Sequence, residues 1–406
     1  MGGLSVHPFV SGGNEMAEVQ RKPIVDKGDQ PAEEKPVATK PDKPVSKTST
    51  KSDSKSEPPT PVVDEDEQFL RELAQQVNTA LKQDNIMVGE EAGGDEGVPY
   101  WILTGIPQLD FAIGGHCHPG IPGARIIEIY GDEAVGKSTL SLHIVKRAIE
   151  QVKAVAYYQD VERVLTPEII KGTQIDMKRV MRDQPETLED VFDSQEVLME
   201  KLIGVERPVV TVVDSIAACS TISEIAVDMK DNNVAPHARL MSKGLRKIKA
   251  AVTTSKVLSL WVNQSREKVG TVSWGDTTTT FGGKAMRFYA SVRIKLSKKM
   301  TLKKTNAIPY GCTIEAKMVK NKVAPPLRTA QYDILFMEDK YGSYPRIDLE
   351  GAILDWCKEY EIISGTTGRY IIDGKSMYKD AARQLLIDHP DIMADLTKKA
   401  YKVDFE

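Results

Sequence analysis

Gly131-Asp132-Glu133-Ala134-Val135-Gly136-Lys137-Ser138 is the stretch that decides the fold of this chain. It matches the pattern G-x-x-x-x-G-K-[ST], in which backbone N–H groups surround phosphate oxygens, the lysine reaches the β and γ phosphates and the hydroxyl binds Mg²⁺. A buried strand is predicted before it at 125–130, and helical spacing follows it at 140–149. These flanks place the phosphates at a helix N-terminus. The alternative is a glycine-rich surface turn.

Acidic residues follow two further predicted strands downstream of this loop. The strand at 155–158 leads into Glu162, and the strand at 208–213 leads into Asp214. Because ligands of parallel α/β sheets bind at the carboxyl ends of the strands, we expect Asp214 to help hold Mg²⁺ and Glu162 to orient or deprotonate the attacking water. The alternatives are a helix N-cap for Asp214 and a solvated surface residue for Glu162.

The strand predicted at 257–262 is followed by an uncharged amide and a long loop. The amide, Gln264, can hydrogen-bond a γ-phosphate and report its loss. The loop, 265–283, has basic ends, glycine hinges, hydroxyls and one large aromatic residue, Trp274. We interpret it as a structureless functional loop, since basic groups with an aromatic suit a nucleic-acid strand. The alternative for Trp274 is packing in the core.

Composition narrows the setting in which the chain works. Its 406 residues, 41% of them hydrophobic, can bury a large core and suggest two or three domains. The net charge of −4 does not single out a partner. Four scattered cysteines have neither disulfide nor metal spacing, which indicates a reducing compartment, and no run approaches the length of a membrane span. We therefore expect a cytoplasmic protein that does not contact a membrane.

The N-terminal part is expected to consist of a disordered tail and a helical arm. Residues 1–66 are rich in Lys, Pro, Ser, Thr, Glu and Asp and cannot bury enough apolar surface to fold. Residues 67–98 contain an amphipathic helix and a linker rich in glycine and acidic residues, so the helix is a candidate arm for a neighbouring subunit. The alternative is packing on its own domain. The helical period is carried by Phe69, Leu70, Leu73, Val77 and Leu81.

The remainder divides into a core and a small C-terminal domain. Residues 99–339 alternate strands and helices, which is typical of a parallel sheet covered on both faces. Residues 340–406 are predicted to be an α+β unit, with helices at 349–360 and 379–388 around a hairpin at 369–375.

Several separated segments resemble hallmark sequences of the bacterial RecA recombinases. The likeness covers about residues 68–400. It is carried by 282–293 and 319–326, and by Asp160-Val161-Glu162, Val213-Asp214-Ser215, Ala238-Arg239-Leu240-Met241-Ser242 and Asn263-Gln264, in the same order as in that family.

This resemblance implies a homopolymeric helical filament that binds ATP and single-stranded DNA, pairs it with homologous duplex DNA and exchanges strands. Glu162 resembles the catalytic glutamate, and Gln264 resembles the γ-phosphate sensor that acts on the second DNA loop. That loop corresponds to 265–281, and the first one to about 225–239.

Lys320 and Lys322 resemble the pair that reaches ATP across the subunit interface. Because only Asn321 separates them, both lysines project from the same side of a strand. The alternative is that they are solvated strand residues. Phe288 resembles an interface relay residue, with core packing in a strand as its alternative.

Some positions depart from the family pattern. The adenine-stacking aromatic of the family falls at Ile169, the second loop is one residue longer, and the first lacks the usual glycines. The chain thus resembles a divergent member. The position of its C-terminal unit resembles the domain that gathers duplex DNA, where Lys398 and Lys399 either contact DNA or form a solvated face.

The expected fold is a RecA-like α/β ATPase core with a mostly parallel central sheet, an N-terminal oligomerisation helix and a small α+β C-terminal domain. The expected function is DNA-dependent ATP hydrolysis in homologous recombination and repair, in the cytoplasm of a bacterium or a phage-infected host. ATP and Mg²⁺ are the expected cofactors, with DNA, single- and double-stranded, and further copies of the chain as partners. The alternatives are a RecA-fold motor such as a helicase and a non-catalytic DNA-coating mediator.

These expectations name particular residues. The catalytic set is Lys137, Glu162, Gln264, Lys320 and Lys322, and Ser138 and Asp214 are the expected metal ligands. The nucleotide-binding set is Gly131, Asp132, Glu133, Ala134, Val135, Gly136, Lys137, Ser138, Thr139, Asp160 and Asp214. The DNA-binding set is Arg239, Arg246, Arg266, Lys268, Trp274, Thr279, Gly282 and Gly283.

Overall fold

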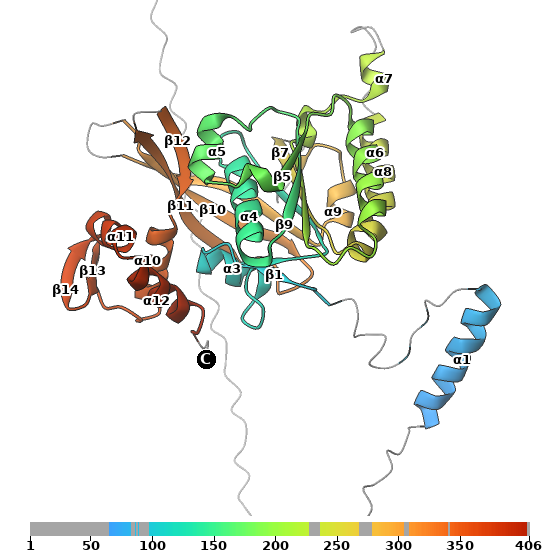
Figure 1. Ribbon diagram of the computed structural model, residues 1–406, viewed down its shortest axis with the longest axis horizontal. Coiled ribbons are helices and arrows are strands. Elements are labelled where there is room, and N and C mark those ends of the chain that lie inside the picture. The colour runs from blue at the N-terminus through green and yellow to red at the C-terminus, as the bar shows by residue number, and fades with distance from the viewer. Residues whose placement is uncertain are drawn as a thin grey trace, which may run out of the picture. The chain divides into compact units, whose positions relative to one another are not determined.

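A ten-stranded sheet organises the computed structural model (Figure 1), which describes residues 65–82, 86, 88, 97–226, 236–267, 278–303, 308–339 and 342–403. The strand order is β12-β11-β10-β9-β3-β7-β6-β4-β5, and β8 pairs with β7. From β9 to β5 all pairs are parallel, whereas β9 to β12 pair antiparallel. This confirms the predicted mostly parallel central sheet.

The strands of this sheet are β3 (Ile126–Gly131), β4 (Val155–Asp160), β5 (Val180–Asp183), β6 (Val209–Asp214), β7 (Leu258–Glu267), β8 (Thr278–Thr280), β9 (Val292–Leu302), β10 (Gly311–Asn321), β11 (Thr329–Asp339) and β12 (Gly342–Ile347). Two short pairs lie outside it, β1 (Trp101–Ile102) with β2 (Ile121–Pro122) and β13 (Arg369–Ile372) with β14 (Lys375–Tyr378).

Helices cover both faces of the sheet, as the continuous apolar strands require. Within β6, Val210 and Val212 belong to one core cluster and Val209 and Val213 to another, so successive side chains face opposite layers. The first cluster includes α4 (Lys137–Val152), and the second includes α6 (Leu188–Leu202), α8 (Pro236–Thr254) and α9 (Ala285–Tyr289). The shorter helices of this region are α3 (Pro107–Gly114), α5 (Pro167–Thr173) and α7 (Ile222–Ile225).

The predicted N-terminal helix is present as α1 (Glu65–Leu81). Its apolar stripe is largely solvent-exposed, with Phe69 at 63% and Leu81 at 59%. The predicted tail at 1–66 lies outside the described residues except for its last two positions. No helix in the described part of the chain is long and apolar enough to cross a membrane.

The C-terminal unit has a core of its own, built from α10 (Leu349–Glu359), α11 (Lys379–Asp388), α12 (Pro390–Ala400) and the β13–β14 hairpin. The expected boundary at residue 340 falls between β11 and β12, and β12 continues the large sheet up to Ile347. Stacking of Phe111 on Trp356, with centroids 5.1 Å apart, joins this unit to α3.

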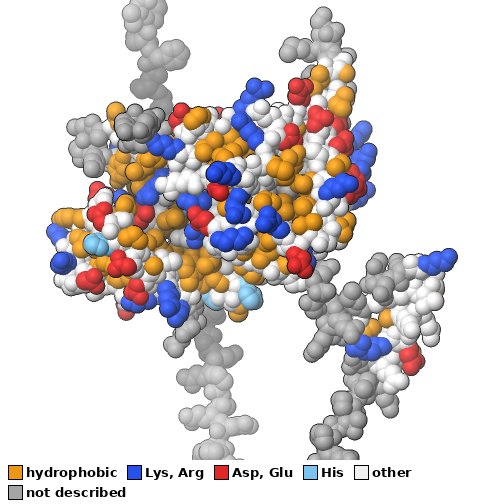
Figure 2. Space-filling view, viewed as in Figure 1, with side chains coloured by type: hydrophobic (Ala, Val, Ile, Leu, Met, Phe, Trp, Pro, Cys, Tyr) orange, Lys and Arg blue, Asp and Glu red, His pale blue; other side chains and the backbone are white. Residues whose placement is uncertain are grey.

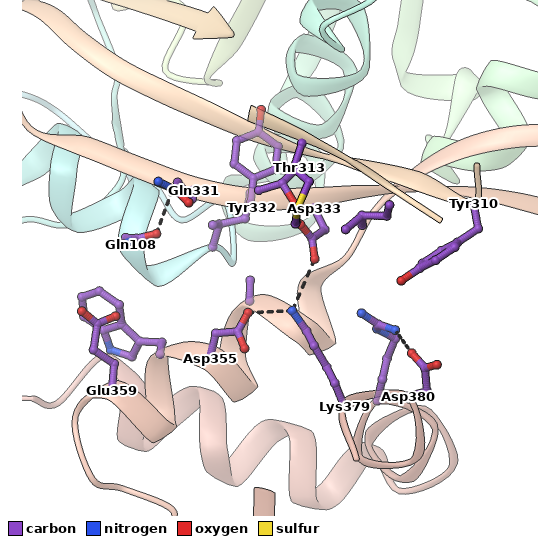
Figure 3. Close-up of a pocket in the computed structure, with 16 residues that line it drawn as sticks. Gln108, Tyr310, Thr313, Gln331, Tyr332, Asp333, Asp355, Glu359, Lys379 and Asp380 are labelled. Carbon is purple, nitrogen blue, oxygen red and sulfur yellow. Dashed lines mark hydrogen bonds and ion pairs between the residues drawn. The ribbon is translucent and has the colours of Figure 1, made fainter. Parts of the chain in front are cut away.

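A pocket of about 340 Å³ separates the sheet from the C-terminal helices (Figure 3). Lys379 at the start of α11 reaches across it. Its Nζ lies 3.3 Å from Oδ2 of Asp333 on β11 and 2.7 Å from Oδ2 of Asp355 on α10. The pair with Asp333 thus connects the C-terminal unit to the sheet, and the pair with Asp355 holds Lys379 within its own unit.

Candidate functional site

The phosphate-binding pattern forms a tight turn between β3 and α4. Gly136 has φ +78°, and a Cβ there would lie 2.3 Å from Cδ1 of Ile334. A Cβ at Gly131 would lie 2.2 Å from the carbonyl oxygen of Leu296. Both positions therefore require glycine, and α4 begins at Lys137 with its free N–H groups at the loop.

Lys137 is held against the loop itself. Its Nζ donates to the carbonyl oxygens of Asp132 at 2.6 Å and of Gly131 at 3.2 Å. Burial lowers the pKa of the Lys137 ammonium, and the charges of Glu162 and Asp214 oppose this. The lysine is thus a cation among carboxylates beside a helix N-terminus.

A cavity of about 660 Å³ opens at this edge of the sheet. It brings together residues from the carboxyl ends of β3, β4, β6 and β7, as the parallel topology requires. The expected site residues that line it are Glu133, Ala134, Val135, Gly136, Lys137, Ser138, Thr139, Glu162, Asp214 and Gln264.

Asp214 ends β6 as a buried carboxylate, 1% exposed. Burial raises its pKa to about 6, against hydrogen bonds from the side chains of Tyr158 and Ser138. The Tyr158 hydroxyl donates to its Oδ2 at 2.6 Å.

A magnesium ion fits this donor set. Mg²⁺ prefers oxygen ligands and is commonly bound by one or two carboxylates together with substrate phosphates. The Ser138 hydroxyl and the Asp214 carboxylate are such oxygens beside the phosphate loop. No group of three or more His, Cys, Asp or Glu side chains among the described residues could hold a metal without such phosphates.

Glu162 lies just beyond β4 and accepts two hydrogen bonds on one oxygen. The Ser215 hydroxyl donates to its Oε1, and Nε2 of Gln264 donates to the same atom at 3.4 Å. Ser215 directly follows β6, and Gln264 lies on β7 and lines the cavity. The structure thus places the expected base in direct contact with the expected sensor.

Three expected nucleotide-binding residues, Gly131, Asp132 and Asp160, do not line the cavity, and Asp160 has an environment of its own. Its carboxylate accepts from the backbone N–H groups of Val164 and Leu165 and pairs with Arg182 at 2.5 Å. It stabilises the turn that carries Glu162. Asp160 therefore supports the cavity from outside it.

The cavity also contains apolar residues that sequence reasoning missed. Phe336, 44% exposed at the end of β11, lines it together with Ile334, Pro345 and Cys312. No sequence spacing connects position 336 with a loop at 131, because β11 reaches this edge only through its pairing with β10 and β12. Ile169 occupies the position of the family's adenine-stacking aromatic. It lines the cavity together with Val164 and Thr166.

The long loop after Gln264 has a regular stem. Its ends were expected to be structureless, but β7 continues to Glu267 and pairs with β8, so that Arg266 lies opposite Thr279. Lys268 and Trp274 lie outside the described residues, as do most of the first loop and the side chains of Arg266 and Thr279. The Asn263 amide donates to the Phe281 carbonyl at 3.0 Å and so ties the end of the loop to β7.

The other expected DNA contacts lie on or beside α8. Gly282 and Gly283 have φ of +80° and +73°, and they pack against Met241 and Ala238 of this helix. Figure 2 shows Lys and Arg side chains along the edge of the molecule where Figure 1 places α6 and α8. The exposed basic residues of α8 are Arg239, Lys243, Arg246, Lys247 and Lys249.

Lys320 and Lys322 lie at the opposite edge of the sheet. In the sheet register, Lys320 of β10 pairs with Arg293 near the start of β9, and Arg293 pairs with Glu128 of β3. The phosphate loop, in contrast, follows the carboxyl end of β3. Lys320 Nζ donates to the carbonyl oxygens of Arg287 and Phe288. Burial and neighbouring cations lower its pKa to about 8. Neither lysine lines the cavity of its own subunit.

Phe288 is 70% exposed on helix α9. The alternative that it packs in the core as a strand residue is therefore wrong. Its backbone carbonyl oxygen is one of the two that accept from Lys320, so Phe288 and this lysine lie side by side.

Comparison with known proteins agrees with this geometry. The family model of the RecA N-terminal domain matches residues 69–340. Protein RecA of Clavibacter michiganensis subsp. michiganensis is 36% identical over 331 residues, 80% of this chain and 86% of that protein. Protein RecA of Frankia alni is 37% identical over 341 residues, 83% and 92%, and that of Synechocystis sp. 36% over 300 residues, 73% and 80%. The chain therefore belongs to the RecA family of homologous recombinases, which are DNA-dependent ATPases.

Proposed function

We propose that this recombinase binds ATP with Mg²⁺ in the 660 Å³ cavity and hydrolyses it when subunits assemble on single-stranded DNA. The observation that carries the proposal is the convergence of Lys137, Glu162 and Gln264 on one cavity at the carboxyl edge of the sheet. The three residues supply a cation, a candidate base and an amide, and they come from separate elements.

The proposed chemistry follows from these positions. Lys137 places a positive charge where the β and γ phosphates gain negative charge in the transition state. Ser138 and Asp214 hold Mg²⁺, which supplies further neutralisation of the phosphate oxygens when bound. Glu162 accepts a proton from the attacking water, and its position is held by Ser215 and Gln264.

The adenine base of ATP is proposed to lie at the apolar end of the cavity. Ile169 and Phe336 offer an aliphatic and an aromatic surface there. Stacking on Phe336 supplies the flat contact that Ile169 cannot.

DNA binding is proposed for the surface that joins α8 to the β7–β8 stem. Its exposed Lys and Arg side chains neutralise backbone phosphates, and Trp274 stacks on or between bases. Gln264 precedes Arg266 by two residues, so a change at the γ-phosphate reaches the loop through a short, hydrogen-bonded strand end. Duplex DNA is proposed to bind the C-terminal unit.

The site is proposed to be completed by the next subunit of a helical filament. Lys320 and Lys322 cannot line the cavity of their own subunit, because they lie at the other edge of the sheet. In a head-to-tail assembly the amino edge of one subunit meets the carboxyl edge of another, which brings both lysines to its ATP. The exposed apolar stripe of α1 is a further candidate subunit contact.

Electron microscopy with single-stranded DNA and a non-hydrolysable ATP analogue tests this function. A continuous right-handed filament that stretches the DNA supports it. Closed rings on DNA would favour a helicase-like motor. Filaments that form equally well without nucleotide would favour a coating protein in which ATP has no catalytic role. We place this activity in the bacterial cytoplasm, on nucleoid or phage DNA.

A further inference from the structure

Tyr158 is a buried tyrosine whose hydroxyl contacts a proposed Mg²⁺ ligand. Its side chain is 0% exposed, and Oη donates to Oδ2 of Asp214 at 2.6 Å. The register pairs Tyr158 of β4 with Val212 of β6, and Asp160 with Asp214. Tyr158 thus lies two positions before Asp214 on the adjacent strand, on the same face of the sheet, and its ring extends toward the strand end.

The same hydroxyl connects the sheet to the phosphate-loop helix. It is hydrogen-bonded to the side chain of Ser141, whose Oγ also lies 3.0 Å from the carbonyl oxygen of Ser138. The Ser138 side chain is in turn hydrogen-bonded to Asp214. The Ser141 hydroxyl has one proton and donates it either to Tyr158 or to the Ser138 carbonyl oxygen, and in both cases polar contacts join the first turns of α4 to β4 and β6.

Packing alone does not account for a tyrosine at this position. Phenylalanine has nearly the same volume and would fill the space without a polar atom. A buried hydroxyl without a partner costs about 1 to 3 kcal/mol, whereas this one is paired with a carboxylate. Its specific effect is on the carboxylate, since a donor fixed to one oxygen determines which oxygen faces the cavity.

We propose that Tyr158 is a positioning residue for the bound cation. Its hydroxyl orients the Asp214 carboxylate toward the Ser138 hydroxyl and thereby strengthens the binding of Mg²⁺ together with a nucleoside triphosphate. The inference rests on the proposed Mg²⁺ and nucleotide site. Removing a group that hydrogen-bonds to a metal ligand typically weakens metal affinity by about 10- to 100-fold.

The test is Tyr158→Phe in the full chain, which removes only the oxygen. Binding of a fluorescent ATP analogue is titrated with MgCl₂ and compared with binding in EDTA. We expect the Mg²⁺ concentration for half-maximal enhancement to rise by about 10-fold or more, with binding in EDTA unchanged. Tyr157→Phe is the matched control, because its hydroxyl donates to Oδ2 of Asp183 outside the cavity, and it should leave the Mg²⁺ requirement unchanged.

Asp214→Asn distinguishes failure of this inference from failure of the site. A raised Mg²⁺ requirement in Asp214→Asn but not in Tyr158→Phe would overturn the positioning role and leave the site standing. No change in either variant would reject the Mg²⁺ site as well. Thermal unfolding in EDTA shows whether Tyr158→Phe is folded. If it is not, Tyr158→Met, which also lacks the hydroxyl, replaces it, and a folded Tyr158→Met with an unchanged requirement overturns the inference.

Discussion

The Gln264 side-chain amide donates a hydrogen bond to Oε1 of Glu162 at 3.4 Å, across 102 positions of the sequence. Glu162 follows β4 and Gln264 lies on β7, with β6 between them in the sheet. The proposed base and the residue that leads into the DNA loop are therefore in contact. This gives the loop a direct physical route to the position of the carboxylate.

Replacing Glu162 by glutamine should separate ATP binding from hydrolysis. The amide keeps the size of the side chain but cannot accept the proton, so turnover should fall by about 10²- to 10⁴-fold while ATP affinity is nearly unchanged. Complexes with single-stranded DNA should then persist after dilution, which a fluorescent oligonucleotide reports. Glu168→Gln, at an exposed glutamate of α5, is the matched control. A variant that left DNA as quickly as the wild type would refute the assignment of Glu162.

Trp274 should report directly on DNA binding. We expect its fluorescence to change when single-stranded DNA is added, and Trp274→Ala to lose DNA pairing much more than ATP affinity, because base stacking contributes about 1 to 3 kcal/mol per base. Trp261, fully buried against Phe192, offers a reference whose emission should not respond. If Trp274→Ala were unfolded and its folded fraction bound DNA normally, the tryptophan would belong to the core instead.

His143 should contribute to acid sensitivity. Its Nε2 lies 2.7 Å from the Thr104 carbonyl oxygen, which can only accept, so this nitrogen carries the proton. Burial, opposed by the hydrogen bond to Thr104 and aided by the cations Arg147 and Lys146, lowers the pKa of His143 from 6.5 to about 4. Between these pH values the unfolded chain binds a proton that the folded chain does not, so stability falls as pH falls from 6.5 to 4.

Replacing His143 by glutamine should remove that part of the pH dependence. The acid-induced loss of unfolding free energy over this window should shrink by about 3 kcal/mol, as measured by urea unfolding at a series of pH values. His118→Gln, at an exposed histidine, should leave the loss as it is in the wild type. An identical pH profile for wild type and His143→Gln would show that the buried imidazole is not the titrating group.

Lys379 should stabilise the attachment of the C-terminal unit in a salt-dependent way. Lys379→Met keeps most of the aliphatic stem but leaves Asp333 and Asp355 without this cation, so it should destabilise the chain by about 1 kcal/mol at low salt. In 1 M NaCl, where the screening length is about 3 Å, the difference should shrink. Lys399→Met breaks an exposed pair with Asp395 and should have almost no effect. Equal effects of both variants in urea unfolding would contradict a special role for Lys379.

Local sequence patterns predicted the elements that carry the site. The phosphate loop, the strands that precede Glu162 and Asp214, and α1 each have a signal within about a dozen residues, and each lies close to its expected position. The helices predicted at 349–360 and 379–388 are α10 and α11.

Features that depend on strand pairing could not be predicted in the same way. Phe336 reaches the cavity because of where β11 lies in the sheet, and Tyr158 meets Asp214 because β4 and β6 are neighbours. The hairpin stem at β8 has only three residues and is specified by its partner β7. The sequence pattern also did not show that residues 342–347 form β12 of the large sheet, because that strand is specified by its pairing with β11.

The most direct test of the account concerns its claim that two subunits form one active site. Lys137→Ala and Lys320→Ala should each abolish turnover, since a cation supplied in trans can be worth about 10³ to 10⁵ in rate. Mixed one to one on single-stranded DNA, they should regain activity, because about a quarter of head-to-tail interfaces then join an intact Lys137 to an intact Lys320. A mixture that co-assembles on DNA but stays as inactive as either variant alone would contradict the account.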